Sequence, residues 1–558
     1  MDSRAEDCIR EQEQLASARG VWENHWREVA ERVRPQQNFF QMIQRPDGDK
    51  RNEKIFDATA PLALSKFAAA VISMSFPATQ TYHKLQISED SVGKDTEVRR
   101  YLDVVNDKLF KVRYSPKANW QAQSGEVVMD IGAFGTGILF TDDVLGVGIR
   151  YKALPLAQCY IAENAHGMVD TLHRKFQWTA HQAASKFGRD NLPEMMRKAL
   201  DTEPQKKFWF LHCVKPNPER KAGRRDYQGM DFWSCYISLE EGRQILEEGG
   251  FRTFPFAVPR FETSPNEFYG RSPAMKVLPD IKMLNEMSKS IIRSAHMAVS
   301  PPIMLSDDGA LQAFNLRPNA LNFGAIDDQG RPRAMPFEAR ARVDIGLDMM
   351  NQRREVINDA FFVTLFRILV EEPQITATEA MLRAQEKGQL LAPTMGRIQS
   401  EMLGQVIERE IDILAHAGEL PPMPDLLREF YMSGGEHHIE YQSPLNMAQK
   451  AGSGVAIMNT MQAIAPLAQI DPKVMMRFNL DKAAERVGRI NGVPEDIIRS
   501  DEEVAAMDQQ AQQAQQAQQL LAAAPVAAGA AKDFAQAASM ASSVPGQVAP
   551  NLGLPQGA

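Results

Sequence analysis

The chain has 558 residues, of which 44% are hydrophobic and 24% are charged, and its formal net charge is −8 at pH 7. Because a single hydrophobic core stops growing at roughly 250 to 300 residues, this length predicts several packed units. The acidic balance argues against a protein that binds nucleic acid tightly by neutralising phosphates, since such proteins are normally basic.

Signals for membrane insertion and for disulfides are weak. The N-terminus is charged from Asp2 onward, which predicts no signal peptide, and the stretch 60–77 contains Lys66 and is too short to cross a bilayer. Four cysteines are widely separated and form no Cys-x-x-Cys pair: Cys8, Cys159, Cys213 and Cys235. We interpret them as buried thiols in a reducing compartment.

The N-terminal part of the chain is expected to be helical. The apolar spacing predicts helices over residues 4–33, 57–76, 96–112 and 118–131. From residue 137 to about 261 the pattern changes to short alternating runs, which predict strands, with one helix near residues 180–187.

Two helices flanking a short insert are predicted after residue 269. Ser272 before Pro273 is a favoured helix start, and this helix is expected to reach about residue 298 with a kink at Pro279. It has one broad apolar face and an opposite polar stripe. Residues 299–336 predict short strands and tight turns, and a second helix is expected over about 337–363.

A loop separates the second helix from a third. Residues 365–374 break the helical pattern, and a Thr-Ala-Thr-Glu capping box at 376–379 begins the third helix, which is expected to bend at Pro393 and end at Gly418. Its apolar stripe is expected to pack back on the strand-rich region. After a linker at 421–424, helices near 447–468, 472–488 and 494–507 are expected to form a separate cap.

The C-terminal tail has low complexity. From residue 508 to 558 the charged residues are Asp508, Lys532 and Asp533, and Ala, Gln, Gly and Pro dominate. Such a segment buries too little apolar area to form a core alone, so disorder is expected beyond residue 544. For residues 509–524, disorder and a helix that forms only against neighbouring chains are equally compatible with the sequence.

Catalytic motifs are weak throughout. The sequence has no Gly-x-x-x-x-Gly-Lys-[Ser/Thr] loop, no His-Glu-x-x-His motif and no Cys/His set with metal spacing, so no catalytic residue, cofactor or metal is predicted. A basic run at 215–225 is more typical of a solvated loop than of a nucleic-acid site. Three pairs of adjacent acidic residues could hold the metal ion of a nuclease, but such pairs are more typical of solvated loops. These pairs are Asp307–Asp308, Asp327–Asp328 and Glu371–Glu372.

The order of these elements resembles the portal proteins, or head-to-tail connectors, of short-tailed tailed bacteriophages. The resemblance rests on the Gly-Arg-Ser-Pro start at 270–273, the Pro-rich insert, the Arg-rich return helix and the Ile-Thr-Ala-Thr-Glu-Ala-Met-Leu-Arg stretch at 375–383. A Gly-rich helix-to-strand junction at 132–139 and a Ser-Pro-Leu turn at 443–445 agree with it. No single motif is specific, and the order and spacing of many weak ones carry the resemblance.

The resemblance implies an α+β, mainly helical subunit. The expected parts are an α/β wing (1–270, with a returning long helix at 376–418), a two-helix stem (271–299 and 337–364), a small α/β clip (300–336), a tunnel loop (365–375), a helical crown (419–508) and a C-terminal barrel helix or disordered tail (509–558).

The resemblance also implies a non-enzymatic ring, dodecameric in that family, at one capsid vertex of the virion. Double-stranded DNA would pass through it, without sequence specificity, during packaging and ejection. The implied partners are further copies of this chain, the terminase large subunit, tail adaptor or tubular proteins, and major capsid and scaffolding proteins. Assembly would take place in the host cytoplasm, without a membrane. An acidic channel wall with a few basic rings would let DNA slide. The net charge alone, however, does not distinguish a channel from most cytosolic proteins.

Three sets of residues are candidates for these roles. The candidates for the DNA channel are Lys282, Lys289, Arg293, Arg353 and Arg354. Those for the tunnel loop are Phe366, Arg367, Ile368, Leu369 and Val370, and those for docking at the clip are Arg317, Arg331 and Arg333. Two alternatives stay open: the stem cations pair with Glu286, Asp344 or Asp348 of an adjacent stem, and the loop's apolar side chains fill the wing core.

Two other classes compete with this interpretation. The Ala/Gln-rich tail suggests an internal virion or scaffolding protein, but such proteins are usually highly charged and helical, whereas residues 137–261 are strand-like. A packaging motor or nuclease subunit is disfavoured because the sequence lacks a phosphate-binding loop.

Overall fold

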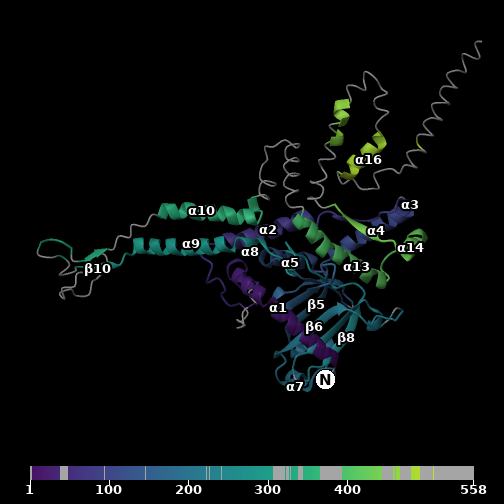
Figure 1. Ribbon diagram of the computed structural model, residues 1–558, viewed down its shortest axis with the longest axis horizontal. Helices are drawn as coiled ribbons and strands as arrows, with labels where there is room; N and C mark the ends of the chain where they lie inside the picture. The colour runs from purple at the N-terminus through teal and green to yellow at the C-terminus, as the bar shows by residue number, and fades with distance from the viewer. Residues whose placement is uncertain are drawn as a thin grey trace, which may run out of the picture. The chain divides into compact units, whose positions relative to one another are not determined.

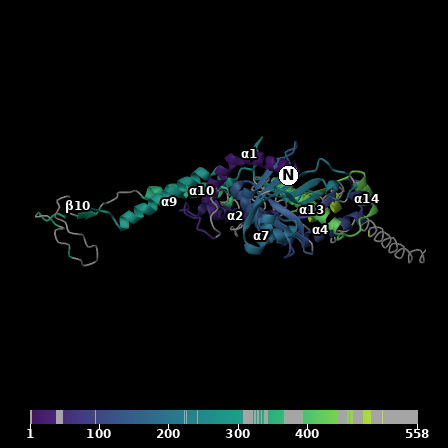
Figure 2. The ribbon, with the colours of Figure 1, turned by 90° about the horizontal axis from the view of Figure 1, so that it is seen from below.

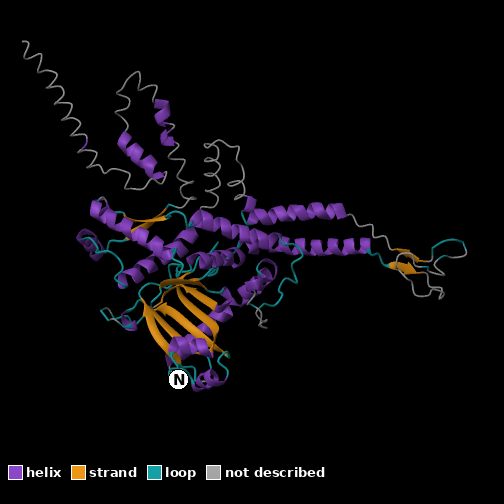
Figure 3. Cartoon of the chain, turned by 180° about the vertical axis from the view of Figure 1, so that it is seen from behind, coloured by secondary structure: helices purple, strands orange, loops and turns teal. Residues whose placement is uncertain are grey.

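The computed structural model describes residues 3–37, 40, 48–93, 95–144, 146–221, 223–224, 226–240, 242–305, 321, 326, 329–332, 334–336, 343–364, 393–442, 456–458, 460–464, 479–490 and 507. The chain divides into two compact units, Met1–Gly452 and Ser453–Ala558. The first combines helices with antiparallel sheets, which confirms the predicted α+β class (Figures 1 and 3). The second contains α16 (Leu480–Ile490).

The predicted N-terminal helices are present. They are α1 (Ser3–Val33), α2 (Thr59–Ser75), α4 (Thr96–Arg113) and α5 (Trp120–Phe134), with the short η1 (Pro35–Gln37) and α3 (Asp90–Gly93) between them. Asp95 begins α4, because its carboxylate accepts hydrogen bonds from the backbone N–H groups of Glu97 and Val98 at 2.9 and 3.0 Å. No helix in the described part of the chain is both long and apolar enough to span a bilayer.

The strand-rich region forms two antiparallel sheets. The larger has the order β4-β5-β6-β7-β8 and the smaller the order β3-β2-β9. The strands are β2 (Leu139–Val144), β3 (Gly148–Ala153), β4 (Cys159–Glu163), β5 (Val169–Thr179), β6 (Lys207–Pro216), β7 (Phe232–Ser238), β8 (Ile245–Phe251) and β9 (Phe256–Ala257). Short 3₁₀ turns, η2 (Leu156–Gln158) and η3 (Tyr227–Gly229), connect them.

Helices cover both faces of the five-stranded sheet. The expected helix at residues 180–187 is α6 (Ala180–Phe187), and a second helix that the sequence analysis missed, α7 (Glu194–Thr202), follows it. These two helices pack on Phe176, Phe208 and Phe210, whereas α1 packs on the opposite face through Ala5, Cys8 and Ile9. Figure 2 shows α1 on one side of this sheet and α7 on the other.

The helix expected from residue 271 to 298 is two helices. The structure has α8 (Pro273–Lys276), then Val277 with φ −103° and ψ 15°, and then α9 (Leu278–Val299). Pro279 lies in the first turn of α9, where its missing N–H costs no hydrogen bond, so the interruption expected near Pro279 takes the form of a break between two helices and not of a kink within one. Strands β10 (Ile303–Leu305) and β11 (Ala334–Pro336) pair beyond α9, and α10 (Val343–Ala360) is the return helix.

The third predicted helix is described from Pro393 onward. It includes a π-helical stretch, η4 (Ile398–Gly404), and continues as α13 (Gln405–His416), and Gly418 follows with φ +68°. As expected, its apolar side chains join the main core, among them Ile398, Met402 and Val406.

The first unit extends further than the expected boundary at residue 419. Helix α14 (Asp425–Met432) and strand β12 (His437–Tyr441) follow the proline-rich linker. Strand β12 pairs antiparallel with β1 (His83–Ile87), so residues 437–441 belong to the first unit and not to a separate cap. The sequence did not predict this pairing because the two strands lie far apart along the chain.

Candidate functional site: the paired helices α9 and α10

Two motifs that the sequence analysis singled out meet at the start of α8. Gly135 ends α5 with φ +81°, and an added Cβ would lie 2.1 Å from the carbonyl oxygen of Gly270. The Gly270 N–H donates to Thr136 Oγ1 at 2.9 Å, and the Ser272 hydroxyl donates to the Ala133 carbonyl at 2.8 Å. This junction fixes where α8 and α9 leave the α/β body.

Helices α9 and α10 run antiparallel and lie side by side (Figure 1). Near their base the buried side chains Ile281, Leu284 and Ile357 join the main core. Further along, Gly346 approaches Ile291 so closely that an added Cβ would lie 3.2 Å from Ile291 Cδ1. The absence of a side chain at Gly346 therefore allows close packing of the two helices.

Asn285 connects the base of α9 to the segment before α2. Its side-chain oxygen accepts hydrogen bonds from the backbone N–H groups of Phe56 and Asp57 at 2.7 and 3.1 Å, and its amide donates to the Ile281 carbonyl at 2.9 Å. A buried amide that satisfies three backbone groups fixes the position of the helix base.

Two of the candidate channel cations lie on α9 and have acidic partners within the chain. Lys282 pairs with Glu28 of α1, and this contact lowers the pKa of Glu28. Lys289 lies 3.7 Å from Glu286 and 5.5 Å from the centre of the Phe56 ring. Pairing with Glu286 was the alternative considered for the stem charges, although here it is a contact within one helix.

The two candidate arginines on α10 are also paired. Arg353 contacts Asp280 of α9 at 2.7 Å, and Arg354 contacts Asp57 at 2.8 Å. Burial raises the pKa of Asp57, but hydrogen bonds from Thr59 and Arg354 outweigh this effect and leave the pKa lowered. These arginines therefore hold the base of the helix pair together.

Arg293 differs from the other four candidates. It is exposed, and it forms no ion pair with another described residue. Exposed apolar side chains occur along both helices, on either side of its position in the sequence. The exposed fractions on the two helices are 42% for Met283, 44% for Ile292, 45% for Met297, 84% for Val299, 46% for Leu347, 38% for Met349 and 41% for Val356.

The short hairpin that follows α9 also exposes apolar side chains. Met304 on β10 and Met335 on β11 face each other in the register, and their exposed fractions are 51% and 54%. Arg331, a candidate docking residue, lies just before β11 and is exposed. The other docking candidates, Arg317 and Arg333, lie outside the described residues. So do all the tunnel-loop candidates, namely Phe366, Arg367, Ile368, Leu369 and Val370, and the three acidic pairs at 307–308, 327–328 and 371–372.

A buried ion pair lies away from these helices. Arg113 at the end of α4 donates from Nε to Glu410 of α13 at 2.8 Å and from Nη1 to the Tyr82 hydroxyl at 2.6 Å, while Tyr151 donates to Glu410. Burial disfavours the charge of Arg113, but the carboxylate of Glu410 outweighs it and raises the arginine pKa. The charges compensate each other, and we interpret the group as a structural link between α4, β3 and α13.

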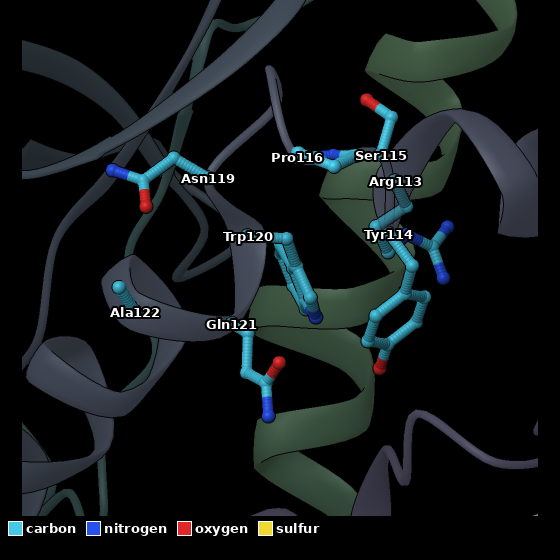
Figure 4. Close-up of a pocket in the computed structure, with 8 residues that line it drawn as sticks. All are labelled: Arg113, Tyr114, Ser115, Pro116, Asn119, Trp120, Gln121 and Ala122. Carbon is cyan, nitrogen blue, oxygen red and sulfur yellow. The ribbon is translucent and has the colours of Figure 1, made fainter.

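A cavity of about 410 Å³ opens beside this ion pair. Arg113, Tyr114 and Trp120 line it from the end of α4 and the start of α5 (Figure 4). The indole N–H of Trp120 has no hydrogen-bond partner among the described residues. The residues that line this cavity, 113–116 and 119–122, include no carboxylate, imidazole or thiol.

The comparisons with known proteins point to one family. Residues 5–498 match the family model for the bacteriophage head to tail connecting protein. The probable portal protein of Bordetella phage BPP-1 is 27% identical over 503 residues, which cover 89% of each chain. The portal protein of Salmonella phage epsilon15 is 26% identical over 561 residues, which cover 100% of each chain.

Among solved structures, a chain from the neck of an empty GTA particle is similar over 73% of this chain and 90% of its own length. Its TM-score is 0.34 and its sequence identity is 13%, so nothing further is inferred from it.

Proposed function

This chain belongs to the family of bacteriophage head-to-tail connecting proteins, and from this premise we propose that copies of it close into a ring around a DNA channel. The chain acts as a portal, the connector between head and tail, and is a component of the virion. Genome packaging and ejection follow from that function. The proposed ring stands at one capsid vertex, with twelve copies, as the resemblance implies.

The structural observation that best supports a ring is the exposed apolar surface along α9 and α10. Asn285 and ion pairs within the chain fix the base of these helices, but apolar side chains are exposed along both of them, among them Ile292, Met297 and Val299 in the distal half of α9. Exposed apolar patches of this kind on a protein surface mark sites of association. The same helices of neighbouring copies would cover these side chains.

In this proposal α9 and α10 are the stem, and the wing is the α/β body from which they extend. Residues 300–336 form the clip, 365–375 the tunnel loop, and the crown and tail follow in the C-terminal part. Moving DNA requires ATP hydrolysis, which we assign to the terminase large subunit and not to this chain. The chain itself supplies a passage and docking surfaces.

Arg293 is the strongest of the five candidates for contact with DNA. A ring would repeat its exposed guanidinium as a belt of positive charge, which touches phosphates without reading bases. Lys282, Lys289, Arg353 and Arg354 each have an acidic partner within the chain, so DNA would have to compete with that partner.

Two single charge-reversal variants distinguish a role of Arg293 in DNA contact from a role in ring assembly. Arg293→Glu is expected to leave rings intact and to reduce DNA packaging or retention in a complementation assay. Arg197→Glu, on α7 of the wing, is the control, because its side chain is also exposed and a distant surface charge should have no effect. Full packaging with Arg293→Glu would contradict a role for Arg293 in the channel.

We assign docking to the clip. The exposed Met304–Met335 pair offers an apolar contact, and Arg331, with the candidates Arg317 and Arg333, offers positive charge. The proposed partners here are the terminase large subunit during packaging and the tail adaptor or tubular proteins afterwards. Capsid and scaffolding proteins would contact the wing.

The tunnel loop is proposed to narrow the bore. The apolar residues among 365–370 follow α10, which ends at Ala360, and they precede the predicted capping box at 376–379. Pro373 between them is expected to prevent two helices from fusing. Replacement of Phe366 to Val370 by Gly and Ser should give rings that package DNA but leak it. Insoluble protein would show instead that these side chains fill the wing core, and normal retention would exclude a valve.

Electron microscopy of the purified full-length protein in negative stain tests the proposed function. A ring with a central hole and no ATPase activity is expected. A filament or an elongated particle would favour the scaffolding alternative, and ATP hydrolysis would favour a packaging enzyme.

A further inference from the structure

Three buried cysteines meet between α1 and the five-stranded sheet. Cys213 on β6 and Cys235 on β7 are direct cross-strand partners, and Cys8 reaches them from α1. Their exposed fractions are 1% for Cys8 and 0% for the other two, and their sulfur atoms all lie within 4.8 Å of one another. The helix and two strands therefore place three soft ligand atoms around one point.

This spacing is close to that of a zinc thiolate site. Tetrahedral zinc with Zn–S bonds of about 2.3 Å holds its sulfur ligands roughly 3.8 Å apart. The three sulfur atoms would need to approach by at most about 1 Å, which rotation of the cysteine side chains can supply. Thiolate and imidazole ligands in a closed tetrahedron are typical of structural zinc.

A fourth side chain of the ligating type is adjacent to the cysteines in the sheet, although it is outside the group of ligand atoms that lie within 4.8 Å of one another. His173 on β5 is the cross-strand partner of Cys213, so its side chain lies on the same face. It is 0% exposed, and neither ring nitrogen has a hydrogen-bond partner among the described residues. A buried imidazole with both nitrogens unsatisfied is costly, and a metal bond to one nitrogen would remove part of that cost.

The surroundings also supply a second shell. Glu11 of α1 lies 3.7 Å from His173 Nε2 and 2.8 Å from the Lys215 ammonium. A carboxylate that accepts from Nε2 would leave Nδ1 for the metal, the arrangement that commonly orients a ligating histidine.

We propose that Cys8, Cys213, Cys235 and His173 form a structural zinc site that fastens the N-terminal part of α1 to the sheet. The thiolate is the form that binds metal.

The site completes a series of attachments along α1. In the middle of the helix Arg19 donates to the carbonyls of Leu156 and Ala157 at 3.0 and 2.9 Å, and near its end Trp26 donates to the Phe134 carbonyl at 3.0 Å. Zinc would add to the contacts of the part before Arg19, which include the ion pairs of Arg4 with Glu248 and of Glu11 with Lys215 and the packing of its apolar side chains.

Metal analysis of the purified full-length protein tests the proposal. After dialysis against a weak chelator, inductively coupled plasma mass spectrometry should find about one zinc ion per chain. Cys8→Ser should reduce the retained zinc at least about tenfold. Cys159→Ser is the matched control, since Cys159 is also 0% exposed but lies in the main core, and it should retain the metal.

Two further measurements keep the test independent of folding defects. Cobalt loaded in place of zinc should give the intense ligand-field and thiolate charge-transfer absorption of a tetrahedral site, and His173→Gln should change that spectrum. Glu11→Gln should weaken zinc binding by about 10- to 100-fold while the protein remains folded.

Three outcomes would overturn the proposal. They are wild-type protein that contains no zinc and takes up no Zn²⁺ added in excess, a native disulfide between two of the three cysteines in a mass spectrum, and a Cys8→Ser variant that retains zinc as fully as Cys159→Ser. An unchanged cobalt spectrum in His173→Gln would remove His173 from the ligand set.

Discussion

At the scale of single residues, Gly135 is a position that has no space for a side chain. Its φ of +81° is unfavourable for any other residue, and a Cβ would meet the backbone of Gly270 at 2.1 Å. Left-handed strain costs roughly 1–2 kcal/mol and overpacking against a fixed backbone about 1–3 kcal/mol, so Gly135→Ala is expected to destabilise the protein by about 3 kcal/mol or more. Thermal denaturation and soluble yield would measure this.

Gly418 provides the control for that substitution. It follows α13 with φ +68°, but no heavy atom lies within 4 Å of its added Cβ. Gly418→Ala should therefore show only the conformational cost of about 1–2 kcal/mol. Equal losses in the two variants would mean that the contact between Gly135 and Gly270 is not tight.

His83 gives the protein a predicted sensitivity to acid. Burial, and secondly the charge of Arg113, lower its pKa well below 6.5. Below pH 6.5 the unfolded chain therefore binds a proton that the folded chain refuses, so stability falls as pH decreases from about 6.5 towards the folded pKa. The slope due to this residue approaches about 1.4 kcal/mol per pH unit.

His83→Gln removes this contribution and keeps a hydrogen-bonding side chain. The groups beside His83 are Tyr82, Arg113 and its cross-strand partner Tyr441, and none of them is altered by the substitution. Melting temperatures measured between pH 7.5 and pH 5 should fall less steeply in the variant than in the wild type. Parallel curves would show that His83 does not control the acid response.

The sequence drew attention to the cysteines and to the stem cations, but it did not predict which residues surround them. The cysteines were expected to be buried thiols, and they are buried, but three of them converge only because β6 pairs with β7 and α1 crosses that pair. No spacing rule links Cys8 to Cys213 and Cys235. The stem cations were likewise recognised, whereas their acidic partners Glu28 and Asp57 come from distant segments.

At the scale of elements, local signals predicted helices well and their interruptions less well. The Ser272 cap was correctly identified, because its hydroxyl accepts from the Met275 N–H at 3.0 Å. The interruption near Pro279 was expected as a kink and is a break at Val277, because a proline lacks the N–H that would donate to the carbonyl four residues earlier. The π-helical stretch η4 was not predicted, since it leaves the apolar period almost unchanged. Strand β12 was missed because a short strand is recognisable only with its partner.

The cross-helix ion pair predicts a measurable coupling between α9 and α10. The side chains of Arg353 and Asp280 are 35% and 24% exposed, so solvent screens their attraction. A double-mutant cycle with Arg353→Met and Asp280→Asn should give a coupling free energy of about 0.5–1 kcal/mol.

Arg293→Met is the matched control, because it removes an exposed arginine that has no ion pair to a described residue. It should change the free energy of unfolding by less than about 0.5 kcal/mol. A coupling energy of zero between Arg353 and Asp280 would mean that this ion pair does not help to hold the helix base, which would then depend on Asn285, the Arg354–Asp57 pair and apolar packing.

At the scale of the whole molecule, the sequence correctly predicted a multi-unit α+β chain of a head-to-tail connecting protein. It did so through the order of many weak motifs. Two of them, at 132–139 and 270–273, are in contact in the structure, which gives a physical reason for their joint presence. Ring formation, by contrast, depends on contacts between copies, and neither the sequence pattern nor a single chain contains them.

The exposed apolar half of the stem predicts how assembly can be separated from folding. Ile292 and Met297 are 44% and 45% exposed in the single chain, so Ile292→Asp with Met297→Asp should cost the subunit little stability. In a ring the same side chains would be covered, and burying two carboxylates without partners would cost several kcal/mol per contact. The double variant should therefore give folded monomers, with unchanged circular dichroism, whereas mass photometry of the wild type should find rings.

Met168→Asp is the control for this double variant. Met168 is 57% exposed between β4 and β5 and is remote in sequence from the stem, so the rings of this variant should persist. Rings in the double variant at micromolar concentration would show that α9 does not contribute its distal half to the subunit interface, and the contact between copies would then have to lie in the wing.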